Sequence, residues 1–395
     1  GVFLIPDWHS DCGGDVSTNG MDAPSSIGRE VPQYAREFLP LQKEVSEMTI
    51  ATIGIDLAKN VIQVHAADQH GREVMKKPLK RGQVLPFFVR LEPCLIGMEA
   101  CGSAHYWARK LSALGHTVKL MAPQFVKPYV KTNKNDAADA EAICEAVRRP
   151  NMRFVPVKTA EQQAVLSLHR ARQAFVKART AQANQIRGLL SEFGITIPQG
   201  IGHITPRLPE ILEDAENELP GRLRLLLTRL GEHLKEMDRQ VTELEREIIS
   251  WHRENEASRK LAEMPGIGPI TASALAASVG DANCFKNGRQ MAAWLGLVPR
   301  HQSTGGKTKL LGISKRGDPY LRSLLVHGAR SMIRHAEGKA DQTTAWFGRL
   351  LARRHKNIAA VAIANKNARI AWALLAHGRA FQSDFARPGV VACTG

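Results

Sequence analysis

Short apolar runs alternate with amphipathic segments between residues 49 and 157, and this pattern predicts an α/β domain. Apolar runs bounded by turn residues are typical of β-strands, and they are found at residues 51–56, 60–66, 73–77, 94–99 and 117–121. Segments with helical spacing are found at residues 81–91, 105–114 and 136–148. Three strands in a meander, followed by alternating helix and strand, are the element order of a ribonuclease-H-like fold.

Residues 158–256 are predicted to form long helices. The first helix spans 161–193, and a segment rich in Pro and Gly, 195–209, follows it. The second helix has apolar residues at alternating steps of four and three, which is the heptad pattern of a coiled coil. They are Leu223, Leu227, Leu230, Leu234, Met237, Val241, Leu244, Ile248 and Trp251. We expect a coiled-coil linker or dimerisation arm, paired either with the preceding helix or with a second protomer; a long charged hairpin is the alternative.

Residues 257–376 are predicted to be a separate, mainly helical domain. The sequence Pro-Gly-Ile-Gly stands between two helical segments at 261–272, which is the form of a helix-hairpin-helix element. Gly266 and Gly268 would there offer backbone N–H groups to a DNA phosphate, and a glycine-rich helix junction is the alternative. Further helices are predicted at 320–335 and 358–376, followed by a flexible tail at 377–395.

The first 48 residues differ from the rest of the chain. They are acidic, rich in Pro, Gly and Ser, and without sustained periodicity, which is typical of disorder. Met48 stands directly before the first predicted strand. We therefore expect residues 1–48 to be a disordered or non-native N-terminal extension; in the second case Met48 is the biological start and residues 1–47 are an over-extended reading frame.

The charge of the chain is strongly positive and unevenly distributed. Residues 1–48 hold eight acidic and three basic residues, a net of −5, so that the rest of this +16 chain carries +21. Such an excess favours a polyanionic partner, above all nucleic acid. An anionic membrane surface is the competing partner, but no uninterrupted apolar run approaches the roughly 20 residues of a spanning helix.

Six cysteines are scattered along the chain without a CxxC motif or the spacing of a zinc site. Reduced, buried thiols in a cytoplasmic protein are therefore expected. The apolar residues 2–5 are far too few for the hydrophobic region of a secretory signal.

Four carboxylates stand where catalytic acids are expected in a fold of this kind. Asp56 and Glu99 each end a predicted strand, and Asp136 and Asp139 lie three residues apart in an Ala-rich helix, so that they share one face. Brought together, they would form a negative cluster that needs hard cations, and Mg²⁺ or Mn²⁺ suits phosphodiester chemistry. Taken singly, each acid is more often a helix cap or a solvated side chain.

Basic residues accompany these acids and a candidate nucleophile. Lys127, Lys131 and Lys134 lie in a basic, loop-like segment that would bind a phosphate backbone beside the metal; a solvated loop is the alternative. Ser303 stands next to two glycines and near several basic residues, as a nucleophile for a phosphodiester would, although by residue type it is more often a turn residue. The basic residues are Arg300, Lys307, Lys309, Lys315 and Arg316.

These motifs together resemble the IS110 family of bacterial insertion-sequence transposases. In chain order they are IGIDLAK at 53–59, NDAADA at 135–140, PGIGP at 265–269, STGGK at 303–307 and GISKRG at 312–317. The segments 312–330 and 364–369 are most similar to the IS1111 branch of the family. The resemblance covers about residues 49–376.

The resemblance implies a transposase or recombinase that cleaves and exchanges DNA strands. It implies a RuvC-like domain whose DEDD quartet is made of the four acids above, with Mg²⁺ (or Mn²⁺) as cofactor. It also implies a C-terminal domain whose serine attacks DNA; we assign this serine to Ser303, with Thr304 and Ser314 as the neighbouring alternatives. The partners implied are the element ends, target DNA, a structured guide RNA and further copies of the chain, in a homodimer or tetramer with a composite active site at the bacterial nucleoid.

Two other functions fit part of the pattern. A RuvC-like endonuclease of the Holliday-junction resolvase type would explain the four acids but not the C-terminal domain with Ser303. An actin-like ATPase or sugar kinase would explain the segment 54–57, but the sequence offers no good second phosphate loop of the Asp-x-Gly type.

Overall fold

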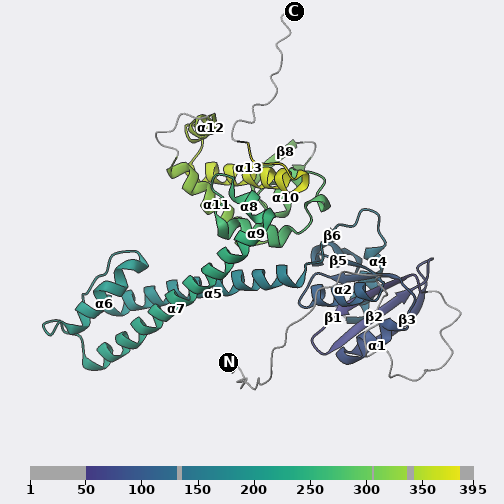
Figure 1. The fold of residues 1–395 in the computed structure, drawn as a ribbon, viewed down its shortest axis with the longest axis horizontal. Helices are drawn as coiled ribbons and strands as arrows, with labels where there is room; N and C mark the ends of the chain where they lie inside the picture. The colour runs from purple at the N-terminus through teal and green to yellow at the C-terminus, as the bar shows by residue number, and fades with distance from the viewer. Residues whose placement is uncertain (1–49, 131–135, 305–306, 336–341, 383–395) are drawn as a thin grey trace, which may run out of the picture. The chain divides into compact units, whose positions relative to one another are not determined.

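The computed structural model describes residues 50–130, 136–304, 307–335 and 342–382. The expected N-terminal extension and most of the expected tail lie outside these ranges, as do Lys131 and Lys134. The described residues form a β-sheet region, a long helical hairpin and a group of C-terminal helices (Figure 1).

A six-stranded mixed sheet is formed by the first part of the described chain (Figure 1). Its strand order is β3-β2-β1-β4-β5-β6. The pairs β1–β4 and β4–β5 are parallel, whereas the other neighbours are antiparallel. The strands are β1 (Thr52–Leu57), β2 (Val61–Ala67), β3 (Glu73–Lys80), β4 (Leu95–Glu99), β5 (Thr117–Met121) and β6 (Phe154–Val155).

Most strand bounds agree with the apolar runs of the sequence, because these runs are short and end at turn residues. The strand expected at 117–121 is confirmed as β5, and β1, β2 and β4 shift by one residue. The strand β6 has two residues and is too short to be recognised from the sequence. The helix expected at 81–91 is instead a 3₁₀ turn followed by a short α-helix.

Helices cover both faces of this sheet. On one face, Ile53 and Ile55 of β1 share an apolar core with Phe88 of α1 and Trp107 of α2. On the other face, Gly54 lies against α4. Ile53, Gly54 and Ile55 face opposite sides of the sheet in turn, because side chains along a strand alternate with a period of two. The helices are α1 (Val84–Val89), α2 (Ala104–Ala113), α3 (Pro123–Val126) and α4 (Asp136–Val147).

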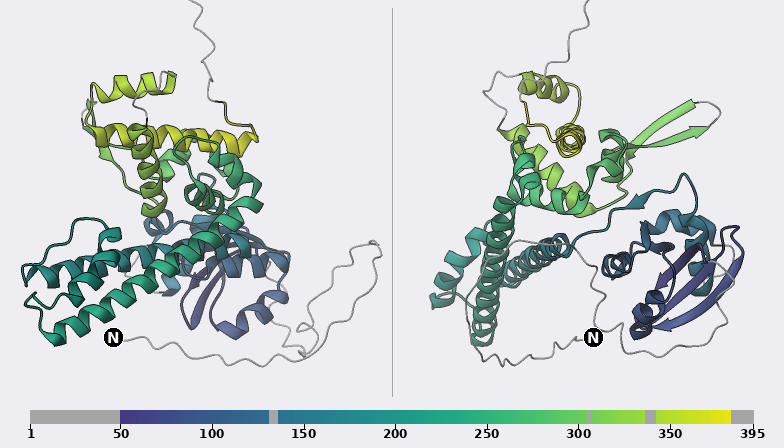
Figure 2. Two further views of the ribbon diagram at one scale, coloured as in Figure 1. Left: turned by 60° about the vertical axis from the view of Figure 1, so that its left-hand side comes forward. Right: turned by 45° about the vertical axis from the view of Figure 1, so that its right-hand side comes forward.

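Two long helices, α5 (Ala160–Ser191) and α7 (Gly221–Glu254), pack side by side (Figures 1 and 2). Ion pairs join Arg172 to Glu245 and Arg179 to Asp238, an order that shows the helices to be antiparallel. The apolar seam of α7 faces inward, and its buried members are Leu227, Leu234, Met237, Val241 and Ile248. The partner of the seam is therefore the preceding helix of the same chain.

The Pro/Gly-rich segment expected as a break contains the first half of a helix, α6 (Ile204–Glu213). Pro209 lies inside this helix, although proline usually ends one. Ile204 and Leu208 are buried against α7, where a Cβ on Gly231 would lie 2.7 Å from the Leu208 side chain. Tertiary packing thus prevails here over the local preference of proline.

The C-terminal helices share one apolar core. They are α8 (Glu256–Ala262), α9 (Pro269–Val279), α10 (Gly288–Trp294), α11 (Pro319–Arg334), α12 (Gln342–Leu351) and α13 (Lys356–His377). Between α10 and α11, the strands β7 (Pro299–Thr304) and β8 (Lys307–Ile313) form a two-stranded ribbon that projects from these helices (Figure 2).

Among the described residues, α13 is the one helix that is long and apolar enough, by length and composition, to cross a membrane. Its buried side chains pack with those of the other C-terminal helices in the apolar core. They are Ala360, Ile363, Ala364, Ala368, Ala371 and Leu374. This packing is that of a core helix.

Candidate metal centre and nucleic-acid interface

Two glycines bring helix α4 close to the sheet. Gly54 of β1 and Gly97 of β4 are register partners. A Cβ on Gly54 would lie 2.1 Å from the carbonyl oxygen of Ala140, and a Cβ on Gly97 would lie 2.8 Å from the Cβ of Val147. Any side chain at either glycine would therefore push α4 away from the sheet.

Asp56 and Glu99 lie on the face of the sheet that is covered by α4. Side chains along a strand alternate between its two faces. Asp56 stands two residues beyond Gly54, and Glu99 stands two residues beyond Gly97, so each carboxylate shares the face of its glycine. Because β1 and β4 are parallel, both acids lie at the same end of the sheet.

The first turn of α4 adds two acids to this end of the sheet. Asp136 and Asp139 both belong to that turn. Oxygen atoms of Asp56, Asp136 and Asp139 lie within 4.8 Å of one another. Asp136 is exposed, whereas the other two are half-buried, so the group is open to solvent. The structure thus joins three acids that are up to 83 positions apart in the sequence.

The donor set of this group fits a hard divalent cation. Oxygen ligands lie about 2.1 Å from Mg²⁺, so two ligands of one octahedral ion are separated by about 3 to 4.2 Å. The oxygen atoms of the three carboxylates lie within 4.8 Å of one another, which is close to this separation, so a small rotation of their side chains is enough to bring them to one ion. Like charges at such distances also repel, and a cation would offset that repulsion.

Glu99 is the one expected acid outside this group of three. It is half-buried on the neighbouring strand. Desolvation, followed by the negative charges of Glu99 and Asp56, raises the pKa of the Cys101 thiol. Both carboxylates are therefore near the same sulfur, and Glu99 lies beside the group rather than in it.

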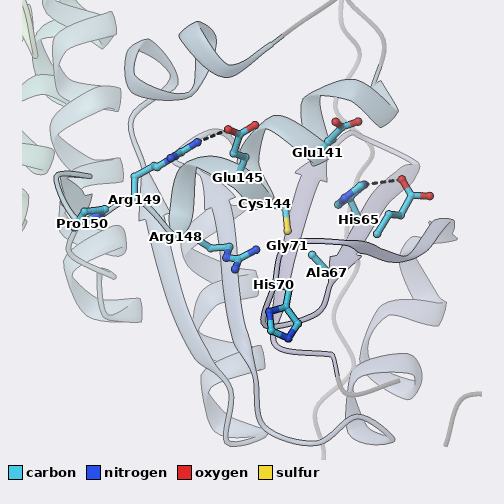
Figure 3. Close-up of a pocket in the computed structure, with 11 residues that line it drawn as sticks. His65, Ala67, His70, Gly71, Glu141, Cys144, Glu145, Arg148, Arg149 and Pro150 are labelled. Carbon is cyan, nitrogen blue, oxygen red and sulfur yellow. Dashed lines mark hydrogen bonds and ion pairs between the residues drawn. The ribbon is translucent and has the colours of Figure 1, made fainter. Parts of the chain in front are cut away.

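A polar pocket of about 620 Å³ lies between α4 and the β2–β3 edge (Figure 3). Nδ1 of the buried His65 lies 3.7 Å from the carboxylate of Glu73. The ammonium of Lys76 lies 3.8 Å from the carboxylates of both Glu73 and Glu141. Arg148 donates to the carbonyl oxygen of Gln69 at 2.7 Å. The Lys76–Glu141 and Arg148–Gln69 contacts join α4 and its C-terminal end to the β2–β3 edge, and so help to hold the helix that carries half of the expected acids.

Ser303 lies in another part of the fold, on the ribbon formed by β7 and β8. It pairs with Thr308, and every residue of β7 is exposed. His301 is two residues earlier on the same strand and shares the face of Ser303. Residue type alone does not connect His301 with Ser303, because their shared face follows only once residues 299–304 are known to form a strand.

All five basic residues expected near Ser303 are exposed. They are Arg300 on β7, Lys307 and Lys309 on β8, and Lys315 and Arg316 in the loop that follows. Lys307 and Lys309 pair with Thr304 and Gln302, so they lie on the face opposite Ser303. The ribbon and its base thus form a surface suited to phosphate groups.

Helices α8 and α9 meet in a glycine turn, as the sequence predicts. Gly266 has φ +77°, and a Cβ on it would lie 2.6 Å from the sulfur of Met332. A Cβ on Gly328 of α11 would lie 1.9 Å from the carbonyl oxygen of Gly266. Gly266 therefore allows α11 to pack on the turn. Gly268 is exposed with open space around it, so it is the glycine that leaves room for a phosphate.

The described residues include only some of the expected lysines at 127–134 and of the six cysteines. Lys127 is exposed on a 3₁₀ turn, whereas Lys131 and Lys134 lie outside the described residues. Burial raises the pKa of Cys94 and Cys144 to about 11, as expected for inert thiols. The remaining described cysteines, Cys101 and Cys284, are exposed, so the expectation of buried thiols is wrong for them. Cys101 lies just after the end of β4, and Cys284 is the last residue of a 3₁₀ turn (Ala282–Cys284), so no apolar run surrounds either of them.

The chain is similar in sequence to transposases. Residues 53–195 match the profile of a DEDD transposase domain of the IS110 type, and residues 258–344 match the profile described as "Transposase IS116/IS110/IS902 family". A "Probable family 20 transposase" of Pseudomonas aeruginosa is 54% identical over 343 residues, which are 87% of this chain and 100% of that protein. The "Transposase for insertion sequence element IS1328" of Yersinia enterocolitica is 46% identical over 84% of this chain and 98% of its own length. The IS1111A transposase of Coxiella burnetii is 42% identical over 90% of this chain and 97% of its own length.

Proposed function

Since the chain belongs to the IS116/IS110/IS902 family of transposases, we propose that it uses a metal-bound acidic group and a serine nucleophile to move an insertion sequence. That it is a DNA transposase or recombinase follows from the family. The observation that carries the proposed mechanism is the group of Asp56, Asp136 and Asp139 at one end of the sheet. Family membership also decides against the sugar-kinase alternative.

The proposed domain division is a RuvC-like domain at 49–157, a coiled-coil hairpin at 158–256 and a serine domain at 257–376. The strand order and the parallel pairing of β1, β4 and β5 support the RuvC-like assignment. The inward-facing heptad seam of α7 supports the coiled-coil assignment. Separate apolar cores in the sheet region and in the C-terminal helices support the two outer domains.

The proposed cofactor is Mg²⁺, held by Asp56, Asp136 and Asp139 with Glu99 beside them. When bound, the cation supplies charge neutralisation at the scissile phosphate and at the leaving oxygen. The acids orient that charge, because α4 is seated directly on Gly54 and cannot move closer to the sheet without a clash.

In the proposed reaction, the hydroxyl of Ser303 attacks the scissile phosphorus. The Oγ–P bond forms, the bond from phosphorus to the leaving nucleoside oxygen breaks, and the serine proton passes to solvent. The phosphoserine ester retains the energy of the phosphodiester, so a 3′-OH on the exchanged strand can reverse the step and join new ends. Basic residues at 127–134 and 300–316 hold the DNA backbone during these steps.

A guide RNA and assembly into dimers or tetramers complete the proposal, and both rest on the family resemblance. The acids and Ser303 lie on different elements of the fold, an arrangement that suits a composite site with acids from one copy and the serine from another. The enzyme would act in the bacterial cytoplasm, at the nucleoid.

The test is a search for a covalent protein–DNA adduct. Purified protein is incubated with Mg²⁺, the end-spanning RNA and labelled donor and target duplexes, and the products are separated on a denaturing gel. The adduct should form with wild type and with Ser314→Ala, and it should be lost with Ser303→Ala and Asp56→Ala. Cleavage that leaves no adduct and survives Ser303→Ala would instead mean a resolvase-like endonuclease.

A further inference from the structure

The outer face of helix α5 carries hydrogen-bond donors and small residues along half of its length. The donors are Arg170, Gln173, Lys177 and Asn184, with Ala174 and Ala181 between them. All six are exposed and border one stretch of open surface. They recur every three, four or seven residues, which places them on one side of the helix.

The positive charges on this face are not matched by acids. Glu161, in the first turn, is the only acidic residue within α5. Arg172 and Arg179 point the other way and form ion pairs with α7. Within the described ranges, neither Arg170 nor Lys177 takes part in an ion pair. Two cations are thus left to face solvent on a helix of 32 residues.

The outer face of α7 has the opposite character. There Arg239 forms ion pairs with Glu236 at 2.6 Å and with Glu243 at 2.7 Å. Such pairs cancel charge on the helix surface and are the common solution for a solvated helix. The outer face of α7 is therefore charge-balanced, whereas the outer face of α5 is basic. Exposure to solvent alone does not account for this difference.

From this asymmetry we propose that the outer face of α5 binds the phosphate backbone of duplex DNA. The stretch from Arg170 to Asn184 is about 21 Å long at 1.5 Å per residue, long enough to follow several phosphates of one strand. The alanines let the backbone approach the helix. This exposed face has no aromatic side chain, and single-stranded nucleic acid is usually bound by stacking on aromatic residues.

The start of α5 is tied to the sheet region. Arg109 of α2 donates to the carbonyl oxygen of Lys158 and to the side chain of Gln163, both at 2.6 Å. DNA held along α5 would therefore be held in a fixed relation to α2. The inference rests on the proposed function, which makes DNA the substrate of the acidic group. It adds the outer face of α5 as a second surface that binds the same DNA.

The test is the salt dependence of DNA binding, measured without divalent cations so that no cleavage occurs. Fluorescence anisotropy gives the affinity of the full chain for a labelled random-sequence duplex between 50 and 200 mM salt. The variant Arg170→Gln/Lys177→Gln is compared with Lys235→Gln/Arg246→Gln, which removes the same charges from exposed positions of α7. Circular dichroism confirms that both are folded.

Each lost phosphate contact lowers the slope of log K against log salt by about 0.9. We expect the slope for the α5 variant to be lower than that for wild type by about 1.8. Between 50 and 200 mM salt the variant should therefore lose about tenfold less affinity than wild type. The α7 variant should keep the wild-type slope. Equal slopes for wild type and the α5 variant would overturn the inference.

Two further outcomes separate the inference from the function on which it rests. A slope change that appears only with double-stranded RNA would overturn the assignment to DNA. If wild type fails to bind duplex DNA at any salt concentration, the proposed function fails together with the inference.

Discussion

The imidazole of His169 bridges two helices: its Nδ1 lies 3.0 Å from the hydroxyl of Tyr320 on α11, and its Nε2 lies 3.1 Å from the hydroxyl of Ser273 on α9. Burial, with a smaller effect of Arg172, lowers the pKa of His169 to about 4, so the ring is neutral. Ser273 already donates to the carbonyl oxygen of Pro269. Its oxygen therefore accepts from Nε2–H, and Nδ1 accepts from Tyr320. One side chain of α5 thus holds both helices.

Replacing His169 should destabilise the chain strongly. His169→Phe removes both hydrogen bonds and leaves the two hydroxyl groups with a buried apolar neighbour, which should cost about 2–3 kcal/mol. Tyr320→Phe removes one bond and should cost about 1 kcal/mol. Urea unfolding followed by circular dichroism measures both values. Equal costs for the two variants would contradict the bridging role.

The same histidine should make stability depend on pH. Its pKa is lowered from 6.5 to about 4 in the folded chain, so between these values the unfolded chain binds the proton and the folded chain does not. Stability should therefore fall as the pH drops from about 6.5 to about 4, by on the order of 3 kcal/mol. Unfolding at a series of pH values tests this, and His169→Phe should show a flatter profile in that window.

Adding a methyl group at Gly54 should disturb the acidic group. The Cβ of Gly54→Ala would lie 2.1 Å from the carbonyl oxygen of Ala140 and 2.4 Å from the nitrogen of Cys144, both backbone atoms of α4. Moving α4 would separate its two acids from Asp56, so Mn²⁺ affinity should fall at least tenfold in a calorimetric titration. Gly188→Ala is the control: it lies in α5 with open space around it and should raise stability by about 0.5–1 kcal/mol.

The four expected acids should differ in their effect on metal binding. Asp139→Asn removes a member of the group of three, whereas Glu99→Gln changes a residue beside it. We expect Mn²⁺ to raise the melting temperature of wild type and of Glu99→Gln, and to have no such effect on Asp139→Asn. Asp139→Asn should also be more stable than wild type without metal, because one repelling charge is gone. A loss of the Mn²⁺ effect in Glu99→Gln alone would show that the ion sits on the neighbouring strand.

The sequence predicted the sheet and its acids because both depend on local patterns. Short apolar runs mark the strands. Asp56 stands two residues beyond Gly54, so strand alternation places both residues on the same face of the sheet. The ribbon that carries Ser303 could not be recognised in this way, since both of its faces are exposed and no apolar alternation marks it. The role of Gly266 also depends on a distant residue, Gly328, which contacts it only in the folded chain.

The partner of the heptad seam could not be predicted for a similar reason. A pattern such as that of Leu227, Leu234 and Val241 specifies an apolar stripe but not the helix that covers it. The structure resolves this: the ion pairs of Arg172 and Arg179 with α7 show that the preceding helix covers the seam in antiparallel order. The break expected at 195–209 is wrong where α6 begins, because Leu208 gains a buried place against α7.

Helix α7 has 34 residues, so it is a rod about 50 Å long. Its seam packs against α5 over most of that length. This packing stiffens α7, so that the helix rotates as a rigid body instead of bending. By simple lever geometry, a rotation of about 10° at one end of a rod of that length displaces the other end by about 9 Å. A small change where α5 meets α9 and α11 would thus be amplified at the far end of the hairpin, where Leu225 and Leu226 stand exposed.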